Sequence, residues 1–284
     1  MQTPEQLIDQ LIELAFAEDV GDGDATTLST IPADAMGRQH LLIKQEGILA
    51  GVDIARRVFD FFDKSLKMTV FIEDGAHVRP GDIAFVVEGP VRSLLQTERT
   101  MLNIMQRMSG IATMTAKYQQ RLEGLHTKVL DTRKTTPGMR ILEKMAVKIG
   151  GGANHRIGLF DMILIKDNHT DFAGGIANAV ARAKQWNRDN GKDLRIEQEV
   201  RNTDEINQAL EAGVDRIMLD NFTPERTAEA VKLIRSKNPN VEIESSGGIT
   251  LDTLRAYGEA GVDFISVGAL THSVNGLDMS FKAC

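Results

Sequence analysis

Between residues 128 and 268 the chain alternates between short apolar segments and longer amphipathic segments, and this alternation restricts the fold more than any other feature. The apolar segments have the length and composition of buried strands; they cover residues 128–131, 162–166, 195–200, 216–220, 241–245 and 264–268. The segments between them repeat apolar residues with the helical period; they cover residues 139–149, 173–189, 203–212, 224–237 and 250–260. Strands that alternate with helices in this way pair in parallel and are joined by right-handed crossovers.

The number of strands decides between two parallel folds. A closed barrel of eight strands needs roughly 250 residues, whereas this region offers fewer residues and fewer strands. We therefore expect an α/β fold in the form of an incomplete barrel with about six or seven strands. An open, doubly wound sheet is the alternative. The chain has neither GxGxxG after a strand nor GxxxxGK[ST], the nucleotide-binding motifs typical of such sheets.

The residues before this region predict a separate α+β domain. Residues 3–6 carry the signature of a capped helix with proline in its first turn. Period-two alternation, typical of strands, follows at residues 40–47, 67–75 and 82–89. Residues 79–82 (RPGD) predict a type II turn, and a long helix is expected from about residue 93 to residue 122. The expected domains are residues 1–112 for the α+β domain, with the tail 271–284 packed on it, and residues 113–270 for the barrel.

The composition argues against several classes of protein. The chain has no apolar, uncharged run of about 18 residues that could cross a membrane, and its first residues lack the basic stretch of a secretory signal. The single cysteine, Cys284, cannot form an internal disulfide or a cysteine-based zinc site, which favours a reducing cytosol and hence a cytoplasmic protein. A net charge of −7 and few aromatic residues argue against nucleic acid as the main partner.

One segment reverses the overall charge. Residues 131–169 hold seven Lys or Arg against four acids, within an acidic chain. A local positive excess of this kind indicates a site for anions. We expect Lys144 and Lys148 to be exceptions that lie on the solvated face of a helix.

Charged residues or glycines stand at nearly every predicted strand end. In parallel α/β folds the residues just past the carboxyl ends of the strands line the site, because the connecting loops meet there. The residues at these ends are Asp131–Lys134, Lys166–His169, Glu197 and Glu199, Asp220 and Asn221, Ser245–Gly248, and Gly268 and Ala269. This agreement along the chain predicts one shared site.

The glycines at the last two strand ends predict a phosphate site. Residues 246–248 precede a helix expected to begin near Thr250, and residues 268–269 follow the final strand. Backbone N–H groups of glycines can approach an anion closely, and a helix N-terminus adds its positive end. Ordinary glycine turns are the alternative, but barrels commonly bind phosphate with the loops after their last two strands.

The two acids Glu199 and Asp220 are expected at the ends of neighbouring strands. Carboxylates of this kind suit Mg²⁺, which binds one or two carboxylates together with substrate phosphate oxygens. Glu197 lies two residues before Glu199 and so faces the same side; we expect it deeper in the barrel or paired with a lysine. A buried salt bridge is the alternative role for each acid.

A cationic wall is expected from five residues: Arg133, Lys134, His155, Arg156 and Lys166. Arginine presents a planar fork to carboxylates, whereas lysine supplies a mobile point charge. A wall that holds both kinds indicates a ligand with carboxylates as well as phosphates. The three glycines at 150–152 predict a flexible loop that approaches this wall.

Several motifs resemble one known family. DTRKT (131–135), NHR (154–156) and IKDNH (165–169) occur together with EQEV, IMLDNF, IESSGGI and SVGALTH at the later strand ends. With EDVGDGDATT (18–27) and QTERTMLNIMQRMSGIAT (96–113), they run almost the whole length of the chain. The set resembles quinolinate phosphoribosyltransferase, also called nicotinate-nucleotide pyrophosphorylase (carboxylating), and no motif position departs from the family pattern.

The resemblance implies a pentosyltransferase of de novo NAD biosynthesis. With Mg²⁺, it would convert quinolinate and 5-phosphoribosyl diphosphate into nicotinate mononucleotide, CO2 and diphosphate. It also implies a homodimer, or a hexamer built as a trimer of dimers, in which Arg99 reaches the partner's site. The residues expected to bind substrate are Arg99, Thr132, Arg133, Lys134, His155, Arg156, Lys166, Glu199, Asp220, Ser246, Gly247, Gly248, Gly268 and Ala269. Those expected to take part in catalysis are Glu199, Asp220, Lys134 and Lys166, the first two also as metal ligands.

Three other functions are compatible with some of these residues. A Schiff-base aldolase would use Lys166 at its strand end, but it leaves Arg133 and Arg156 without a role. A paralogue of the same fold, found beside molybdate transport genes, would bind related ligands without this reaction. A non-enzymatic nucleotide sensor would bind a phosphate ligand tightly without turnover.

Overall fold

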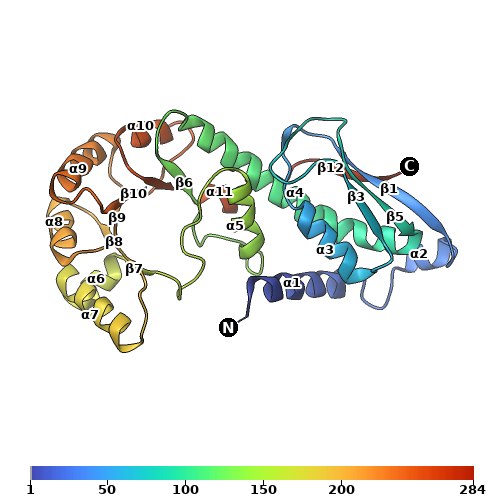
Figure 1. Cartoon of the computed structure of the whole chain (residues 1–284), viewed down its shortest axis with the longest axis horizontal. Helices are drawn as coiled ribbons and strands as arrows, with labels where there is room; N and C mark the ends of the chain where they lie inside the picture. The colour runs from blue at the N-terminus through green and yellow to red at the C-terminus, as the bar shows by residue number, and fades with distance from the viewer. Residues whose placement is uncertain (1) are drawn as a thin grey trace. The chain divides into compact units, whose positions relative to one another are not determined.

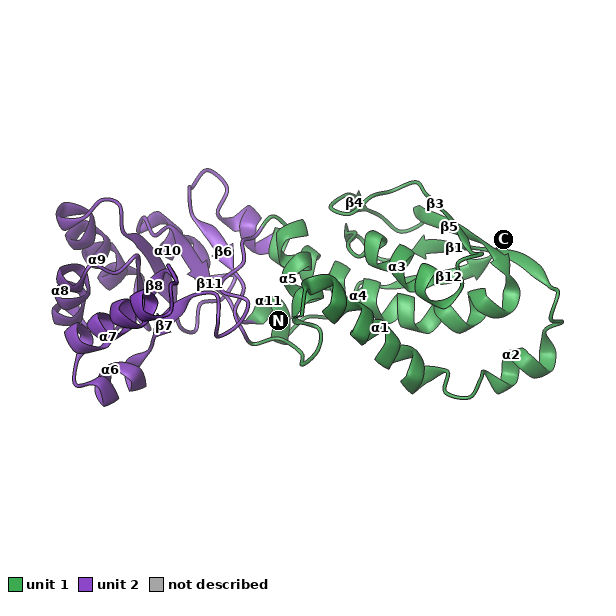
Figure 2. Cartoon of the chain, turned by 60° about the horizontal axis from the view of Figure 1, so that its bottom comes forward, with its two compact units in different colours: residues 1–116, 134–151, 269–284 green, residues 117–133, 152–268 purple. Residues whose placement is uncertain are grey.

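The structure is a computed structural model that describes residues 2–284 and divides the chain into two compact units. Residues up to 116, 134–151 and 269–284 form the first unit, and residues 117–133 and 152–268 form the second (Figure 2). These bounds differ from the predicted domains. The predicted division after residue 112 falls inside α4 (Val91–Arg121), a helix that continues from one unit into the other. Residues 134–151, expected in the barrel, belong to the first unit because their helix α5 (Arg140–Ile149) packs against α1 (Pro4–Asp19).

The first unit is an α+β domain built on a four-stranded sheet with the order β12-β1-β5-β3. Its remaining elements are α2 (Ala25–Thr30), β1 (Met36–Ile43), β2 (Gly47–Ile48), α3 (Val52–Phe62), β3 (Lys67–Val70), β4 (His77–Val78), β5 (Ile83–Pro90), α11 (Ala269–His272) and β12 (Met279–Ala283). Strand β12 runs antiparallel to β1, so the end of the chain lies in this sheet. Helix α3 packs on the sheet through Phe59, whose ring lies 6.2 Å from that of Phe85 and 5.9 Å from that of Phe281.

Local signals in the first unit gave two correct predictions and one shifted strand. Thr3 caps α1 and exchanges hydrogen bonds with Gln6 in both directions. Gly81, with φ of +99°, confirms the expected turn. The strand expected at residues 40–47 is β1 at 36–43 instead, because its register is set by β5 and β12, and Arg38 pairs with Glu88 across the strands at 3.2 Å.

The second unit confirms the predicted α/β architecture. Its six parallel strands have the order β6-β11-β10-β9-β8-β7, so β6 and β7 lie at opposite edges and the barrel is incomplete. The helices lie outside the curved sheet (Figure 1). The elements are β6 (Lys128–Leu130), β7 (Ile163–Ile165), α6 (Asp167–Ala173), α7 (Ile176–Asp189), β8 (Ile196–Val200), α8 (Thr203–Ala212), β9 (Arg216–Asp220), α9 (Pro224–Lys237), β10 (Glu242–Ser246), α10 (Leu254–Glu259) and β11 (Phe264–Ser266). In the described residues, no helix has both the length and the apolarity needed to cross a membrane.

Candidate active site

The interior face of the parallel sheet carries many of the predicted site residues. Gln198 points to the helical side, where its amide donates a hydrogen bond to Thr170 of α6. Because side chains alternate along a strand, its neighbours Glu197 and Glu199 face the interior. The strand registers continue this face from strand to strand. One strand-end position on it comes from each strand: Thr132, Lys166, Glu199, Asp220, Ser246 and Gly268.

Glu199 and Asp220 form a pair of carboxylates on this face. Burial of Glu199 and the nearby Asp220 carboxylate raise the pKa of Glu199, while Lys166 and a hydrogen bond from the backbone N–H of Asp167 oppose the shift. Asp220 accepts a hydrogen bond from Asn221 Nδ2 at 2.7 Å. The structure therefore brings together the two acids and the lysine that the strand ends predicted. A cation beside the two carboxylates would relieve their repulsion.

Two arginines of the predicted cationic wall lie close to each other in the second unit. Burial of Arg156 lowers its pKa, and the positive charge of nearby Arg133 lowers it further. Arg133 is exposed and Arg156 is partly buried, with its Nη1 donating to the backbone oxygen of Met162 at 3.3 Å. Two guanidinium groups held near each other favour the binding of an anion with more than one negative charge.

The other predicted binding residues, Arg99, Lys134 and Ala269, belong to the first unit. Arg99 is exposed on α4, and in the described part of the chain its guanidinium takes part in no hydrogen bond or ion pair. Lys134 is also exposed, and its backbone oxygen accepts a hydrogen bond from Thr271 Oγ1 at 2.8 Å. Ala269 begins the short helix α11.

The glycine loop after β10 has the backbone that close approach to an anion requires. Gly247 and Gly248 have φ of +102° and +61°. Asn221, also at positive φ, donates its backbone N–H to Ser246 at 2.9 Å and lies against Gly247. The helix expected near Thr250 begins only at residue 254. A turn in which the Leu254 N–H donates to the Thr250 oxygen at 2.9 Å precedes this helix, and the contribution of a helix N-terminus beside the glycines stays a prediction.

A buried group lies on the same interior face. His155 Nε2 is 2.9 Å from Glu197 Oε2 and 3.6 Å from Glu244 Oε2. Burial raises the pKa of Glu197 to about 7; burial and the Glu197 carboxylate raise that of Glu244 to about 8. Of the two expected places of Glu197, the deeper position in the barrel is confirmed, and its buried partner is His155 rather than a lysine. Glu244 and Arg216 were missed, although charges within strands as apolar as RIMLD and VEIES are a signal that each needs a partner.

Lys144 also differs from its prediction. It was expected on the solvated face of a helix, together with Lys148. Lys148 is exposed, but Lys144 is 2% exposed on α5. The period of the helix marks its apolar face correctly, but it does not show how much of the polar face the rest of the fold covers.

Comparison with known proteins decides the family. The description "Quinolinate phosphoribosyl transferase, N-terminal domain" matches residues 24–109, and the corresponding C-terminal domain matches residues 111–282. The chain belongs to the quinolinate phosphoribosyltransferase family. Among its family members, quinolinate phosphoribosyltransferase (decarboxylating) 1b of Nicotiana tabacum is 44% identical over 289 residues, which cover 96% of this chain and 81% of that protein.

Two further relatives match along all or nearly all of the chain. The chloroplastic nicotinate-nucleotide pyrophosphorylase (carboxylating) of Arabidopsis thaliana is 43% identical over 288 residues, which cover 96% of this chain and 81% of that protein. The solved structure of the nicotinate-nucleotide pyrophosphorylase from Francisella tularensis has a TM-score of 0.92 at 41% identity and covers 100% of this chain and 98% of its own. The likeness thus includes both domains.

Proposed function

We infer that this chain transfers the phosphoribosyl group of 5-phosphoribosyl diphosphate to quinolinate with decarboxylation, and so makes nicotinate mononucleotide in NAD biosynthesis. The observation that carries this function is the interior face, to which each parallel strand contributes one strand-end position. The chain that carries this face belongs to the quinolinate phosphoribosyltransferase family. The names of the relatives support this activity rather than an aldolase or the molybdate-associated paralogue.

The cationic residues and the carboxylates have different roles in this reaction. Arg133, Lys134, Arg156 and Lys166 hold the two carboxylates of quinolinate, so that the pyridine nitrogen meets C1 of the ribose. The bond from C1 to the diphosphate oxygen breaks as the bond to nitrogen forms, and no protein nucleophile is needed. Glu199 or Asp220 stabilises the positive charge that develops at C1. The quaternised ring then stabilises the electron pair that remains on ring carbon 2 when the carboxylate leaves as CO2, and a proton binds to that carbon.

Mg²⁺ is the cofactor that fits the carboxylate pair. Glu199 and Asp220 offer only oxygen ligands, and burial together with the Asp220 carboxylate raises the pKa of Glu199. These two residues would hold the ion, which when bound neutralises charge on the departing diphosphate. The 5′-phosphate fits the loops at Ser246–Gly248 and at Gly268–Ala269, and Thr132 adds a hydroxyl on the same face.

The assembly we propose is a homodimer, or a hexamer of three dimers, in which Arg99 enters the partner's site. Its exposure and lack of partners in the described residues support this role. A cytoplasmic location stays a prediction from the single cysteine. Some relatives are named as mitochondrial or chloroplastic proteins.

A turnover assay tests the function directly. With quinolinate, 5-phosphoribosyl diphosphate and Mg²⁺, we expect one CO2 released for each nicotinate mononucleotide formed, and we expect EDTA to abolish both products. Nicotinate lacks one carboxylate and its charged contacts, so its kcat/KM should be about 100-fold lower. Binding of both substrates without any CO2 release, or equal rates with nicotinate and quinolinate, would contradict the proposed reaction.

Gly247→Ala tests the phosphate loop, with Gly248→Ala as its matched control. Both glycines have positive φ, but a methyl group at Gly247 would also overlap the Asn221 side chain, whereas Gly248 has no neighbouring atom within 4 Å. We expect Gly247→Ala to raise the KM for 5-phosphoribosyl diphosphate by about tenfold or more, and Gly248→Ala by about threefold. Equal KM values for the two variants would show that the overlap with Asn221 at Gly247 does not affect the binding of 5-phosphoribosyl diphosphate.

A further inference from the structure

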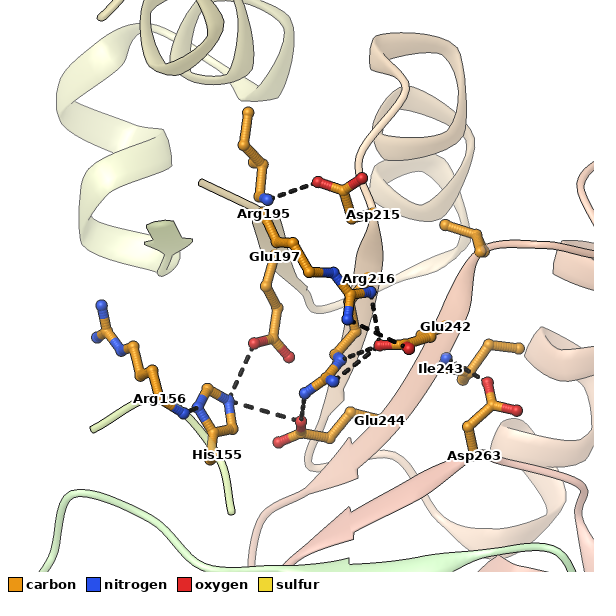
Figure 3. Close-up of polar contacts among 12 residues, drawn as sticks. His155, Arg156, Arg195, Glu197, Asp215, Arg216, Glu242, Ile243, Glu244 and Asp263 are labelled. Atoms are coloured by element: carbon orange, nitrogen blue, oxygen red, sulfur yellow. Dashed lines mark hydrogen bonds and ion pairs between the residues drawn. The ribbon is translucent and has the colours of Figure 1, made fainter. Parts of the chain in front are cut away.

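His155 joins the cationic wall to the charged interior of the second unit. Figure 3 shows one nitrogen of its ring facing both Glu197 and Glu244, which come from strands β8 and β10. The His155 side chain is 6% exposed, and both glutamate side chains are 0% exposed. Charged groups buried this deeply persist only when each has a partner. The arrangement of these partners therefore restricts where the ring can lie.

The hydrogen bonds of the ring also fix the position of its proton. The backbone N–H of Arg156 donates to His155 Nδ1 at 2.7 Å. An Nδ1 that accepts a hydrogen bond carries no proton, so the ring proton is on Nε2, which faces Glu197. The backbone N–H of His155 donates to the buried carboxylate of Asp131 at 2.9 Å. The backbone N–H groups of His155 and Arg156 are thus each fixed by a hydrogen bond, to Asp131 and to the His155 ring respectively.

Arg216 gives the group its charge balance. Its Nη1 lies 3.1 Å from Glu244 Oε2, the oxygen that also faces His155. Its other two nitrogens, Nη2 and Nε, lie 2.7 Å and 2.9 Å from Glu242 Oε2. The ligand atoms of His155, Glu197 and Glu244 also lie close enough together for a metal ion. Arg216 supplies one positive charge to the group, and His155 Nε2 lies at ion-pair distance from Glu197, so these charges can offset one another without an ion.

We propose that Glu197 and Glu244 are positioning residues for quinolinate binding: they hold His155 in its Nε2–H tautomer, and His155 in turn fixes the backbone from which Arg156 reaches the substrate. This inference rests on the proposed contact of Arg156 with a quinolinate carboxylate. In the described residues the guanidinium of Arg156 makes one hydrogen bond, the long one to Met162, and the carboxylates of Glu197 and Asp161 attract it. Its direction therefore depends on the backbone that His155 fixes.

Nitrogen NMR of the histidine rings tests the hydrogen bonds independently of activity. In protein with ¹⁵N-labelled histidine, two-bond ¹H–¹⁵N correlations separate the tautomers of the six histidines, and a His155→Gln variant assigns the ring. We expect an unprotonated Nδ1 and a protonated Nε2. In Glu197→Gln the tautomer should persist, because the amide oxygen still accepts, while the Nε2 resonance shifts.

Steady-state kinetics test the positioning role. Glu197→Leu removes the acceptor, and we expect it to raise the KM for quinolinate by about tenfold with the KM for 5-phosphoribosyl diphosphate changed by less than about twofold. Glu197→Gln should restore most of the quinolinate affinity. Glu242→Gln is the matched control. It weakens the ion pair between Arg216 and Glu242, but Glu242 does not contact His155, so the quinolinate KM of this variant should be unchanged.

Three outcomes would overturn the inference. A protonated Nδ1, or an Nε2 resonance that Glu197→Gln leaves unchanged, would remove the hydrogen bond to Glu197, and this result holds even if Glu197→Leu does not fold. Equal rises in both KM values would show general damage to the site. A normal tautomer together with a normal quinolinate KM in Glu197→Leu would separate His155 from Arg156, although the transferase reaction itself would stand.

Discussion

Replacing Arg133 by alanine is expected to lower kcat/KM for quinolinate by about 10³-fold, the effect of losing a charged, two-point contact to a carboxylate that has left water. The reason lies in the pair that Arg133 forms with Arg156. Burial lowers the pKa of Arg156, and the positive charge of Arg133 lowers it further, because the two guanidinium groups repel each other in the free protein. A dianion between them relieves this repulsion. Removal of one arginine therefore affects the bound state most.

Initial rates at saturating 5-phosphoribosyl diphosphate and varied quinolinate measure this loss. Arg133→Lys keeps the charge but not the planar fork, and we expect it to lose about 30-fold. Arg188→Ala, on the outer helix α7, is the surface control; its guanidinium contacts only Gln185 in the described residues, and its kinetics should match the unmodified protein. Near-normal kcat/KM in Arg133→Ala would remove this residue from the carboxylate site.

The strands of the barrel could be predicted from sequence because each is a short apolar run that two layers of the fold bury. The ends of β9 agree with the prediction to the residue, and so do those of α9, where Thr223 caps the helix and Pro224 begins it. Alternation within such strands also predicted correctly that Glu199 and Asp220 would lie together. These features depend on local sequence and on one rule of parallel sheets, and neither requires knowledge of distant contacts.

The features that sequence missed depend on register and packing between distant segments. Glu197 and Glu244 lie near one another only because β10 pairs with β9, and β9 with β8, in one particular register, and His155 reaches them because Ala153 pairs beside Leu130 of β6. No local pattern encodes that register, so His155 was placed on the substrate wall without its buried partners. The burial of Lys144 and the continuity of α4 across the two units likewise depend on what packs against each helix.

A mixture of inactive Arg99→Ala and inactive Arg133→Ala proteins is expected to regain about a quarter of the activity of the unmodified protein once subunits exchange. In a mixed dimer, the Arg133 of one subunit and the Arg99 of the other complete one site, and the second site lacks both arginines. Random exchange makes about half of the dimers mixed, with one intact site each. Both residues are exposed, so neither substitution is expected to disturb folding.

The recovered activity separates the two possible places of Arg99. If Arg99 acted in its own subunit's site, every mixed dimer would hold two defective sites, and the mixture would be as inactive as its components. Native mass spectrometry of subunits with different tags establishes that exchange has occurred, and each variant mixed with itself gives the baseline. A trimer of dimers should give the same fraction, because each shared site involves only one pair of subunits. Exchange without recovery would therefore place Arg99 in its own subunit's site, in a dimer and in a hexamer alike.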